Sequence, residues 1–308
     1  MKSKNQGMQD LNLIHLNSRI DDPNLSRKNE LTSHVQFFDG VPLPSVIEIS
    51  ESGTCNRSCS FCPRSAPNFP DIKTFINQAF VKKIGTQLST WNYQGLILFS
   101  GFVEPLLDKN IANHIAELKS SAPNAQIELV TNGDPVTVST LNKLANAGLD
   151  KMLVSCYDGE WQLDDIGALV SQSKFSIEDV VFRKRWLPEE ENFGISLSNR
   201  GGMMKNAEFS LSELQDPMKA PCFYPSHTLF IDYNGDVLLC AHDWGKKAIA
   251  GNIHKETIHQ IWTGKNFSMS RKALSAGKRS FSPCNICNVK GTRTGRAHAE
   301  AWGDCNNV

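Results

Sequence analysis

The chain has 308 residues, of which 40% are hydrophobic and 21% are charged. These values are typical of a globular protein with one large domain or two moderate ones. Its 32 basic and 32 acidic side chains give a formal net charge of zero, so neither nucleic acid nor an anionic membrane is expected as a partner. The longest apolar runs, such as residues 96–99, are far too short to span a bilayer.

The cysteine content indicates metal binding. The N-terminus is polar and lacks the apolar core of a signal peptide, so we expect a protein of the reducing cytoplasm. Nine cysteines in such a chain favour metal ligation over a disulfide framework.

In chain order, residues 1–42 are rich in Asn, Ser, Asp and Lys and are predicted to form a partly ordered leader. Strands and helices then alternate, which predicts parallel strands joined by crossover helices. The strands are predicted at 46–50, 96–99, 127–130, 151–155, 180–182 and 194–197, and the helices at 71–90, 108–121 and 136–147.

The pattern of predicted elements changes near residue 216, where short strands, turns and further cysteines begin. A hairpin is predicted at 228–240 around the Asn234-Gly235 turn, followed by a helix at 255–276 and a polar tail at 291–308. We therefore expect a first domain over 43–215 and a smaller second domain over 216–290.

Three cysteines follow the first predicted strand at close spacing. The segment 54–64, TCNRSCSFCPR, sets Cys55, Cys59 and Cys62 in a C-x3-C-x2-C pattern, with Phe61 directly before the last thiol. Three thiolates on one loop can hold three irons of a [4Fe-4S] cluster and leave the fourth iron open to a cofactor. The alternative is a structural zinc loop, but zinc usually takes four ligands and no fourth ligand lies nearby.

This spacing, the aromatic residue before the third cysteine and the preceding strand resemble the radical S-adenosylmethionine (SAM) enzymes. The resemblance implies an α/β fold, with a partial (β/α)6 TIM-like barrel whose cluster loop follows the first strand. It also implies that the open iron chelates SAM. An electron from the cluster then cleaves SAM to methionine and a 5'-deoxyadenosyl radical, which takes a hydrogen atom from the substrate.

The next strand ends carry residues that match the family's SAM-binding elements. Gly101 and Glu104 in FSGFVEP, residues 99–105, resemble the GGEP element, in which backbone and a carboxylate hold the SAM ammonium. The pair Phe102-Val103 departs from the pattern, because a small residue usually precedes the glutamate. The alternative for Glu104 is a simply solvated carboxylate.

Other SAM contacts are implied by the same resemblance. Asn132 and Ser155, at the ends of the third and fourth predicted strands, would bond the ribose or the carboxylate of SAM. Phe61 would lie against the adenine. The alternative for Asn132 is turn chemistry, because Asn-Gly is a common turn dipeptide.

Four later cysteines form a second set. Intervals of 17, 43 and 2 residues separate Cys222, Cys240, Cys284 and Cys287. The set resembles the auxiliary-cluster domain called SPASM, in its shortened "twitch" form with one [4Fe-4S] cluster. A saturated cluster is suited to passing electrons. A zinc ion on the four thiols is the alternative, and Cys305 could supply a ligand if one of the four does not.

The two clusters together imply a reaction. Twitch-containing relatives include enzymes that oxidise aminocyclitol alcohols, so a dehydrogenase of a sugar or cyclitol hydroxyl is the leading hypothesis. Arg200, near the end of a late strand, would bind this small substrate, with structural ion pairing as its alternative. An external one-electron donor such as flavodoxin or ferredoxin is the expected protein partner.

Two alternative functions stay open. A peptide maturase often carries an extra N-terminal recognition domain, for which residues 1–42 are too short and irregular. A redox-neutral epimerase needs a hydrogen donor on the opposite face of the substrate, and Cys156 at a strand end is the candidate. A buried packing thiol is the alternative for Cys156.

Overall fold

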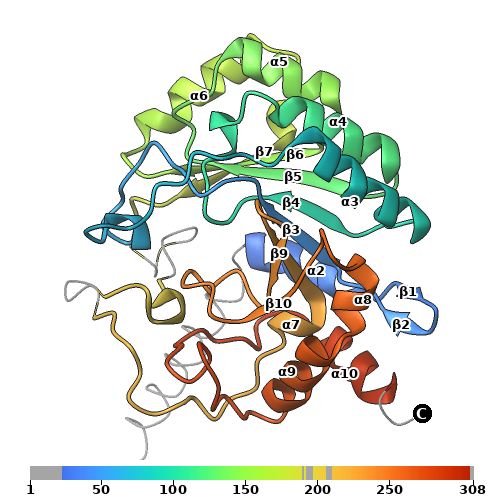
Figure 1. Cartoon of the computed structure of the whole chain (residues 1–308). Coiled ribbons are helices and arrows are strands. Elements are labelled where there is room, and N and C mark those ends of the chain that lie inside the picture. The colour runs from blue at the N-terminus through green and yellow to red at the C-terminus, as the bar shows by residue number, and fades with distance from the viewer. Residues whose placement is uncertain (1–22, 189–190, 192–196, 206–209, 306–308) are drawn as a thin grey trace, which may run out of the picture.

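A single large sheet organises the computed structural model, which describes residues 23–188, 191, 197–205 and 210–305 (Figure 1). The strand order is β10-β9-β8-β3-β4-β5-β6-β7, and the six strands from β8 to β7 pair in parallel. The strands are β3 (Val46–Ser50), β4 (Leu96–Phe99), β5 (Gln126–Thr131), β6 (Lys151–Cys156), β7 (Val180–Lys184), β8 (Thr228–Asp232), β9 (Asp236–Leu238) and β10 (Ile249–Asn252).

Four helices cover one face of this sheet and leave the other face as the barrel interior (Figure 1). They are α3 (Gln78–Thr90), α4 (Ile111–Ser121), α5 (Val138–Ala147) and α6 (Trp161–Ser171). Alternation along the strands divides the side chains between the two faces. In β3, Ile47 and Ile49 join the large core, whereas Val46 packs in a separate cluster with Leu96 and Leu98. The predicted α/β class with parallel strands is confirmed.

Two predicted helices begin later than expected. The helix predicted at 71–90 starts at Gln78, because the Asn77 side chain accepts from the Phe80 amide and caps it. The preceding residues are extended, and Ile72 bridges Gly53 in the cysteine loop. The helix predicted from 108 starts at Ile111, after the short helix η2 (Pro105–Leu107).

The C-terminal part continues the same sheet. The predicted hairpin is present, with β8 and β9 antiparallel, and β8 also pairs in parallel with β3. The sixth parallel strand is therefore β8, whereas the strand predicted at 194–197 falls mostly on residues outside the described part. The two predicted domains thus share one sheet, and their boundaries stay a prediction.

The helix predicted at 255–276 is divided at Gly264 into α8 (Ile258–Thr263) and α9 (Lys265–Ser275). Gly264 has an extended backbone, with φ −65° and ψ 166°, and it both ends α8 and begins α9. A substituent there would lie 2.8 Å from the Gln260 carbonyl, so this close turn requires glycine.

The described residues of the leader and of the tail form regular elements that the composition did not predict. The leader contains α2 (Pro23–Ser33) and a hairpin of β1 (Phe37–Phe38) with β2 (Val41–Pro42), and the tail contains α10 (Arg296–Cys305). Buried side chains explain the difference, because His298 Nδ1 donates to the Thr32 carbonyl (3.1 Å) and Trp302 Nε1 donates to the Ser226 carbonyl (3.2 Å). None of the described helices is long and apolar enough to cross a membrane.

A buried arginine joins three of these C-terminal helices. Its guanidinium carbon lies 4.0 Å from the ring centroid of Trp262 and 3.8 Å from that of Trp302, and its Nε donates to the Pro225 carbonyl (2.8 Å). This residue, Arg271, is 3% exposed, and burial lowers its pKa to about 8. Its packing against the rings thus connects α8, α9 and α10.

We predict that Arg271→Ala lowers the midpoint of thermal unfolding by roughly 5 °C or more, because it removes the packing between two indole rings and leaves a cavity. Arg271→Met keeps the apolar stem and avoids burying a charge, so it is expected to lose less than half as much. The neighbouring exposed Lys272→Ala is the control, measured by the same thermal melt. A melt of Arg271→Ala that matches this control would contradict the assignment.

Candidate active site

The first cysteine loop follows β3 at the carboxyl end of the parallel strands. Backbone bonds between Gly53 and Ile72 close the base of the loop, and the Glu104 amide donates to the Thr54 carbonyl (2.9 Å). Because β4 pairs with β3 in register, the segment that follows β4 meets the loop that follows β3. Parallel pairing therefore brings the cysteines and the GGEP-like segment together.

The three thiols of this loop lie close enough to influence one another. Burial raises the pKa of each, and Cys59 reaches about 11 because Cys62 and Cys55 add to the effect of burial. The amide of Arg57 donates to Cys55 Sγ (3.4 Å), and an amide two residues on also bonds Cys62. The donor set is purely sulfur on one loop, which fits a [4Fe-4S] cluster with one open iron.

An arginine between the first two cysteines clamps the loop to the neighbouring strand ends. Arg57 donates from Nε and Nη2 to Asp134 (2.7 and 2.5 Å), which follows β5. It also donates from Nη1 and Nη2 to Asp158 (2.9 and 2.5 Å), which follows β6. Two bidentate contacts fix both the position and the plane of the guanidinium. Reasoning from the sequence missed this clamp, because its two aspartates lie far away in the chain.

Glu104 is the best-anchored of the predicted SAM ligands. Its carboxylate accepts from Thr131 Oγ1 (2.7 Å), the Asn132 amide (2.7 Å) and the Leu106 amide (3.1 Å). The side chain is 2% exposed, and burial raises its pKa to about 7 against these hydrogen bonds. A buried carboxylate beside an open cluster site is suited to hold an ammonium.

The departure from the GGEP pattern has a packing reason. Gly101 has φ +103°, and a Cβ there would lie 2.9 Å from both Phe230 and Ser50, so glycine is required. Phe102 donates its amide to Ser50 Oγ (2.9 Å), and its ring packs against Phe230 and Trp244 at 4.9 and 4.7 Å. The bulky residue thus joins this segment to the C-terminal part of the chain.

The other predicted SAM contacts lie around the same edge. Phe61 lies 5.3 Å from the Tyr157 ring. Asn132 Nδ2 donates to Asn56 Oδ1 (2.7 Å) and lies 3.8 Å from Cys55 Sγ, so this side chain contacts the cysteine loop. Ser155 Oγ accepts from Arg183 of β7 (2.5 Å). These positions agree with a SAM site, and the individual contacts to SAM stay a prediction.

Cys156 lies away from this site. It is fully buried in the large core, which also contains Met152 and Val154 from the same strand, and burial raises its pKa to about 11. Because strand residues alternate between faces, Ser155 and Cys156 point to opposite sides of the sheet. The structure thus places this thiol with the packing residues rather than with the barrel interior.

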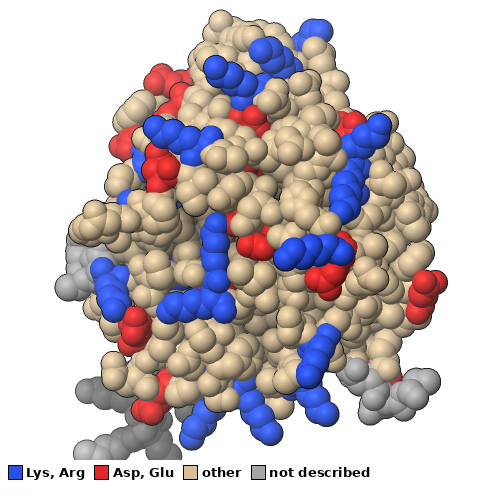
Figure 2. Space-filling view, in the orientation of Figure 1, with Lys and Arg blue, Asp and Glu red and all other residues tan. Residues whose placement is uncertain are grey.

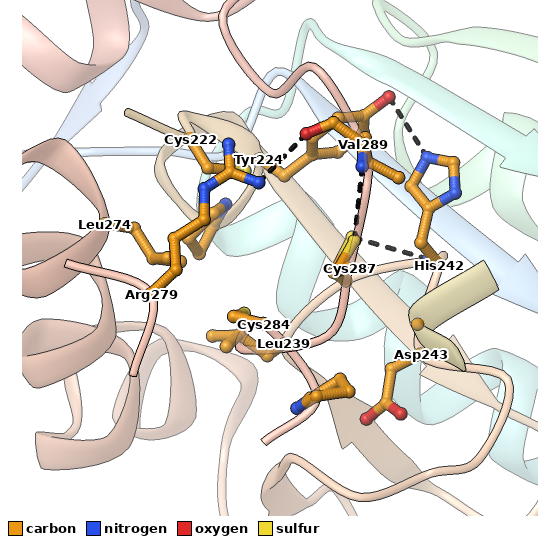
Figure 3. A pocket seen from close by; sticks show the side chains of 14 residues that line it. Cys222, Tyr224, Leu239, His242, Asp243, Leu274, Arg279, Cys284, Cys287 and Val289 are labelled. Carbon is orange, nitrogen blue, oxygen red and sulfur yellow. Dashed lines mark hydrogen bonds between the residues drawn. The ribbon is translucent and has the colours of Figure 1, made fainter. Parts of the chain in front are cut away.

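The second cysteine set surrounds one cavity (Figure 3). Cys222, Cys240, Cys284 and Cys287 all line it, together with Tyr224, His242, Leu239 and Val289 among other residues. All four are free cysteines, and burial raises the pKa of each. Four thiols around an apolar space fit a saturated iron–sulfur cluster, so the predicted grouping has a geometric basis.

Backbone amides are already directed at these sulfurs. The His242 amide donates to Cys240 Sγ (3.4 Å) and the Val289 amide to Cys287 Sγ (3.5 Å). In both cases the donor lies two residues after the cysteine, as Arg57 does after Cys55. Such bonds stabilise thiolate charge and raise the reduction potential of a cluster held there.

Arg200 lies between the two cysteine sets. It belongs to the short helix η4 (Arg200–Gly202), and its Nη1 is 3.4 Å from His242 Nδ1. His242 Nε2 is in turn 3.4 Å from the Tyr224 hydroxyl, and Figure 3 shows these two side chains at the cavity. The Arg200 charge also acts on Cys62 of the first set, where it opposes the rise in pKa that burial causes. Burial lowers the pKa of His242 to about 3, so the imidazole is neutral. Arg200 thus contacts a residue that lines the cavity of the second set, and its binding of a substrate stays a prediction.

Sequence comparison assigns the chain to a family. The model of the radical SAM superfamily matches residues 49–164, and the model of the iron–sulfur cluster-binding domain SPASM matches residues 222–288. The S-adenosyl-L-methionine-dependent 2-deoxy-scyllo-inosamine dehydrogenase of Niallia circulans is 30% identical over 253 residues, which are 81% of this chain and 95% of the relative. The chain belongs to the radical SAM enzymes. It is a radical SAM oxidoreductase that uses SAM and two iron–sulfur clusters.

Solved structures support the same assignment of this radical SAM enzyme. A crystal structure of BtrN in complex with AdoMet and 2-DOIA has a TM-score of 0.68 at 28% identity, and covers 84% of this chain and 98% of that chain. BtrN in an open conformation has a TM-score of 0.61 at 26% identity, with coverages of 83% and 97%. The predicted barrel fold is therefore confirmed. Histidine-tagged anSMEcpe with bound AdoMet, at 12% identity, a TM-score of 0.51 and coverages of 86% and 96%, shows the fold alone.

We predict that Arg57→Ala raises the KM for SAM by about tenfold, because the cysteine loop loses the charge-assisted bonds that fix it to the two aspartates. Arg57→Lys keeps the positive charge but lacks the planar guanidinium that makes two bidentate contacts, so it is expected to recover only part of the lost affinity for SAM. Steady-state formation of 5'-deoxyadenosine gives the values, with the exposed Lys109→Ala as control. An unchanged KM in Arg57→Ala would show that the clamp does not position the loop.

The raised pKa of Glu104 predicts a pH dependence of SAM binding. An ionised carboxylate holds the ammonium, so the affinity for SAM is full above about pH 7 and decreases as the pH falls through that value. Equilibrium binding to the reconstituted protein at pH 6 and pH 8 measures the change, expected to be several-fold. Glu104→Gln is expected to bind weakly at both values. A pH dependence that persists in this variant would assign the titration to another group.

Proposed function

We propose that this radical SAM enzyme oxidises a hydroxyl of a small sugar- or cyclitol-like molecule to a carbonyl. The observation that carries the proposal is the complete set of four thiols around one cavity. Tyr224, His242 and Arg200 contact one another beside it, and the charge of Arg200 also acts on Cys62 of the first loop. The printed activity of the Niallia circulans relative, an inosamine dehydrogenase, supports the same class of substrate.

Seven cysteines would hold the two iron–sulfur clusters that supply the redox chemistry. Cys55, Cys59 and Cys62 would hold the SAM-binding cluster, and the four later cysteines would hold the auxiliary cluster. When bound, SAM and its cluster would supply a radical that takes a hydrogen atom from the substrate carbon, and the auxiliary cluster would supply an acceptor for one electron. Loss of the hydroxyl proton then balances a two-electron oxidation of alcohol to ketone.

The protein side chains would bind and orient both molecules. Glu104 and the backbone at Gly101 hold the SAM ammonium, while Asn132 and Ser155 bond the ribose or the carboxylate of SAM and Phe61 lies against the adenine. Arg200 orients the substrate between the two clusters by donating to its oxygens.

Glu48 is suited to take the hydroxyl proton. Its side chain lies on the interior face of β3, Ser100 Oγ donates to it (2.5 Å), and burial raises its pKa above the ordinary value. A carboxylate with a raised pKa is a better base than an exposed one. The charge of Arg200 opposes the rise in the pKa of Glu48 that burial causes, so the two groups lie near enough to influence each other.

The proposal assigns no chemical role to Cys156, because its side chain faces the core. An epimerase would need another hydrogen donor in the interior, and no observation favours a peptide substrate. The first cluster needs an electron for each turnover, so an external one-electron donor such as flavodoxin or ferredoxin completes the system.

The test is anaerobic turnover of the reconstituted enzyme with a panel of neutral, amino and acidic ring polyols that includes 2-deoxy-scyllo-inosamine. We expect one 5'-deoxyadenosine for each ketone formed. Cys59→Ala is expected to abolish both products. Cys284→Ala is expected to lower ketone formation at least tenfold while SAM cleavage continues, since only the electron acceptor is lost.

Two results would contradict the proposal. Cleavage of SAM with return of hydrogen to the same carbon in inverted configuration would indicate epimerisation. Ketone formation that Cys284→Ala leaves unchanged would show that the auxiliary cysteines do not take the electron.

A further inference from the structure

A buried arginine lies at the wall of the cavity that the second cysteine set surrounds (Figure 3). Arg279 follows α9 in the chain and is only 2% exposed. Its Nε donates to the Ala220 carbonyl (2.9 Å), its Nη2 to the Pro221 carbonyl (2.8 Å) and its Nη1 to the Val289 carbonyl (2.9 Å). Bonds to three carbonyls fix both the position and the plane of this guanidinium.

The same bonds connect two of the segments that carry the thiols. Pro221 directly precedes Cys222. The amide of Val289 donates to Cys287 Sγ (3.5 Å), while its carbonyl accepts from the arginine. Arg279 is thus held beside the thiols by backbone groups adjacent to them, and it lines the same cavity as all four cysteines.

The charge of Arg279 is not paired with a carboxylate in the described part of the chain, because its nitrogens bond to carbonyl oxygens instead. Residues 257–299, which contain Arg279, Cys284 and Cys287, include no acidic side chain. A buried cation is normally paired with an anion, because its removal from water is costly. The missing negative charge is the charge that four thiolates around iron would bring to this cavity.

The clamp of the first cysteine loop differs in this respect. Arg57 is also held by several hydrogen bonds, but its partners are the carboxylates of Asp134 and Asp158. Two anions therefore balance the cation of Arg57, whereas the cation of Arg279 is available to a negatively charged group in the cavity.

One carboxylate also lines the cavity of the second set. Asp243 accepts from two backbone amides (3.0 and 2.7 Å), so its oxygens are bonded to the chain and not to Arg279. Burial raises the pKa of Cys284 and Cys287, and the charge of Arg279 opposes this rise more strongly than the charge of Asp243 adds to it. The cation therefore has the larger effect on these two thiols.

Exposed basic side chains cannot replace this buried one. Figure 2 shows Lys and Arg side chains over the surface together with Asp and Glu, in contact with solvent. Water and dissolved ions screen such charges. Arg279 lies instead at an apolar cavity away from solvent, where a charge acts through a medium of lower dielectric constant.

We infer that the cation of Arg279 raises the reduction potential of the auxiliary cluster and so makes that cluster an acceptor for the substrate's electron. A reduced cluster carries one more negative charge than an oxidised one, and a nearby fixed cation stabilises the reduced form. The inference rests on the proposed function, in which the four later cysteines hold this cluster, and it adds the residue that sets the potential. Arg279 is a positioning residue, because it acts through the cluster and its ligands.

The electron balance of the step is that of the proposed oxidation. After the hydrogen atom and the hydroxyl proton have left the substrate, one electron remains to be removed, and it reduces the auxiliary cluster by one unit. An external one-electron carrier then reoxidises the cluster before the next turnover.

The test is an anaerobic redox titration of the reconstituted, SAM-loaded enzyme, followed by electron paramagnetic resonance. SAM alters the signal of the first cluster, so the two clusters are distinguished in one sample and the first serves as an internal reference. Arg279→Gln and Arg279→Lys each keep a hydrogen-bond donor on a flexible side chain, and they differ in charge. Arg271→Gln is the matched control, because Arg271 is a comparably buried arginine that does not line the cavity.

We expect Arg279→Gln to lower the equilibrium constant for electron acceptance by the auxiliary cluster at least tenfold, which is about 59 mV for a one-electron couple. Arg279→Lys keeps the charge and is expected to stay within about threefold of the wild type. Both variants should leave the potential of the first cluster unchanged, and Arg271→Gln should change neither potential.

An unchanged potential in Arg279→Gln would overturn the inference, as would equal shifts in Arg279→Gln and Arg279→Lys, since a purely structural role does not depend on charge. Loss of the auxiliary iron from both variants would also overturn it and make Arg279 a structural residue. A tenfold shift in Arg279→Lys alone overturns it whether or not Arg279→Gln retains its iron. Ketone formation by the wild type tests the proposed function separately, because the potentials are measured without substrate.

Discussion

Parallel pairing of β3 with β4 on one side and with β8 on the other is the constraint on which the site depends. It places the loop after β3, the segment after β4 and the end of β8 at one edge of the sheet, whereas Cys222 precedes β8 and Cys240 follows the antiparallel strand β9. Glu104 makes this arrangement rigid, because its backbone bonds the cysteine loop and its carboxylate bonds the end of β5.

The C-terminal module is an extension of the barrel sheet. β8 and β9 bring Cys240 and His242 to the barrel, and Phe102, Phe230 and Trp244 form an aromatic contact across the junction. A rigid junction fixes the distance between the two groups of thiols. In the proposed reaction the substrate gives a hydrogen atom at the SAM site and an electron to the auxiliary cluster, so a fixed distance between these two sites is an advantage.

Local patterns in the sequence predicted much of the barrel and the position of the first cysteine loop. The predicted strands 46–50 and 96–99 match β3 and β4, and the C-x3-C-x2-C loop follows β3 as expected. The contacts of Arg57 and Arg183 were missed, because their partners lie between 28 and 101 residues away in the chain. Glu48 could have indicated the interior face of the first strand. It is the single charged residue of an apolar strand, and because side chains alternate between faces it points away from the packed core. Composition was misleading for residues 296–305, because Trp302 and His298 are buried and fix a helix in a segment that was predicted to be a polar tail.

The central claim is that one cysteine set leaves an iron open for SAM while the other is saturated. The most direct measurement is the Mössbauer spectrum of the anaerobic protein enriched in 57Fe, recorded with and without SAM. The account predicts two [4Fe-4S] clusters, with the signal of a single iron site altered by SAM and the second cluster unchanged. One cluster together with a bound zinc, or a spectrum that SAM does not affect, would contradict it.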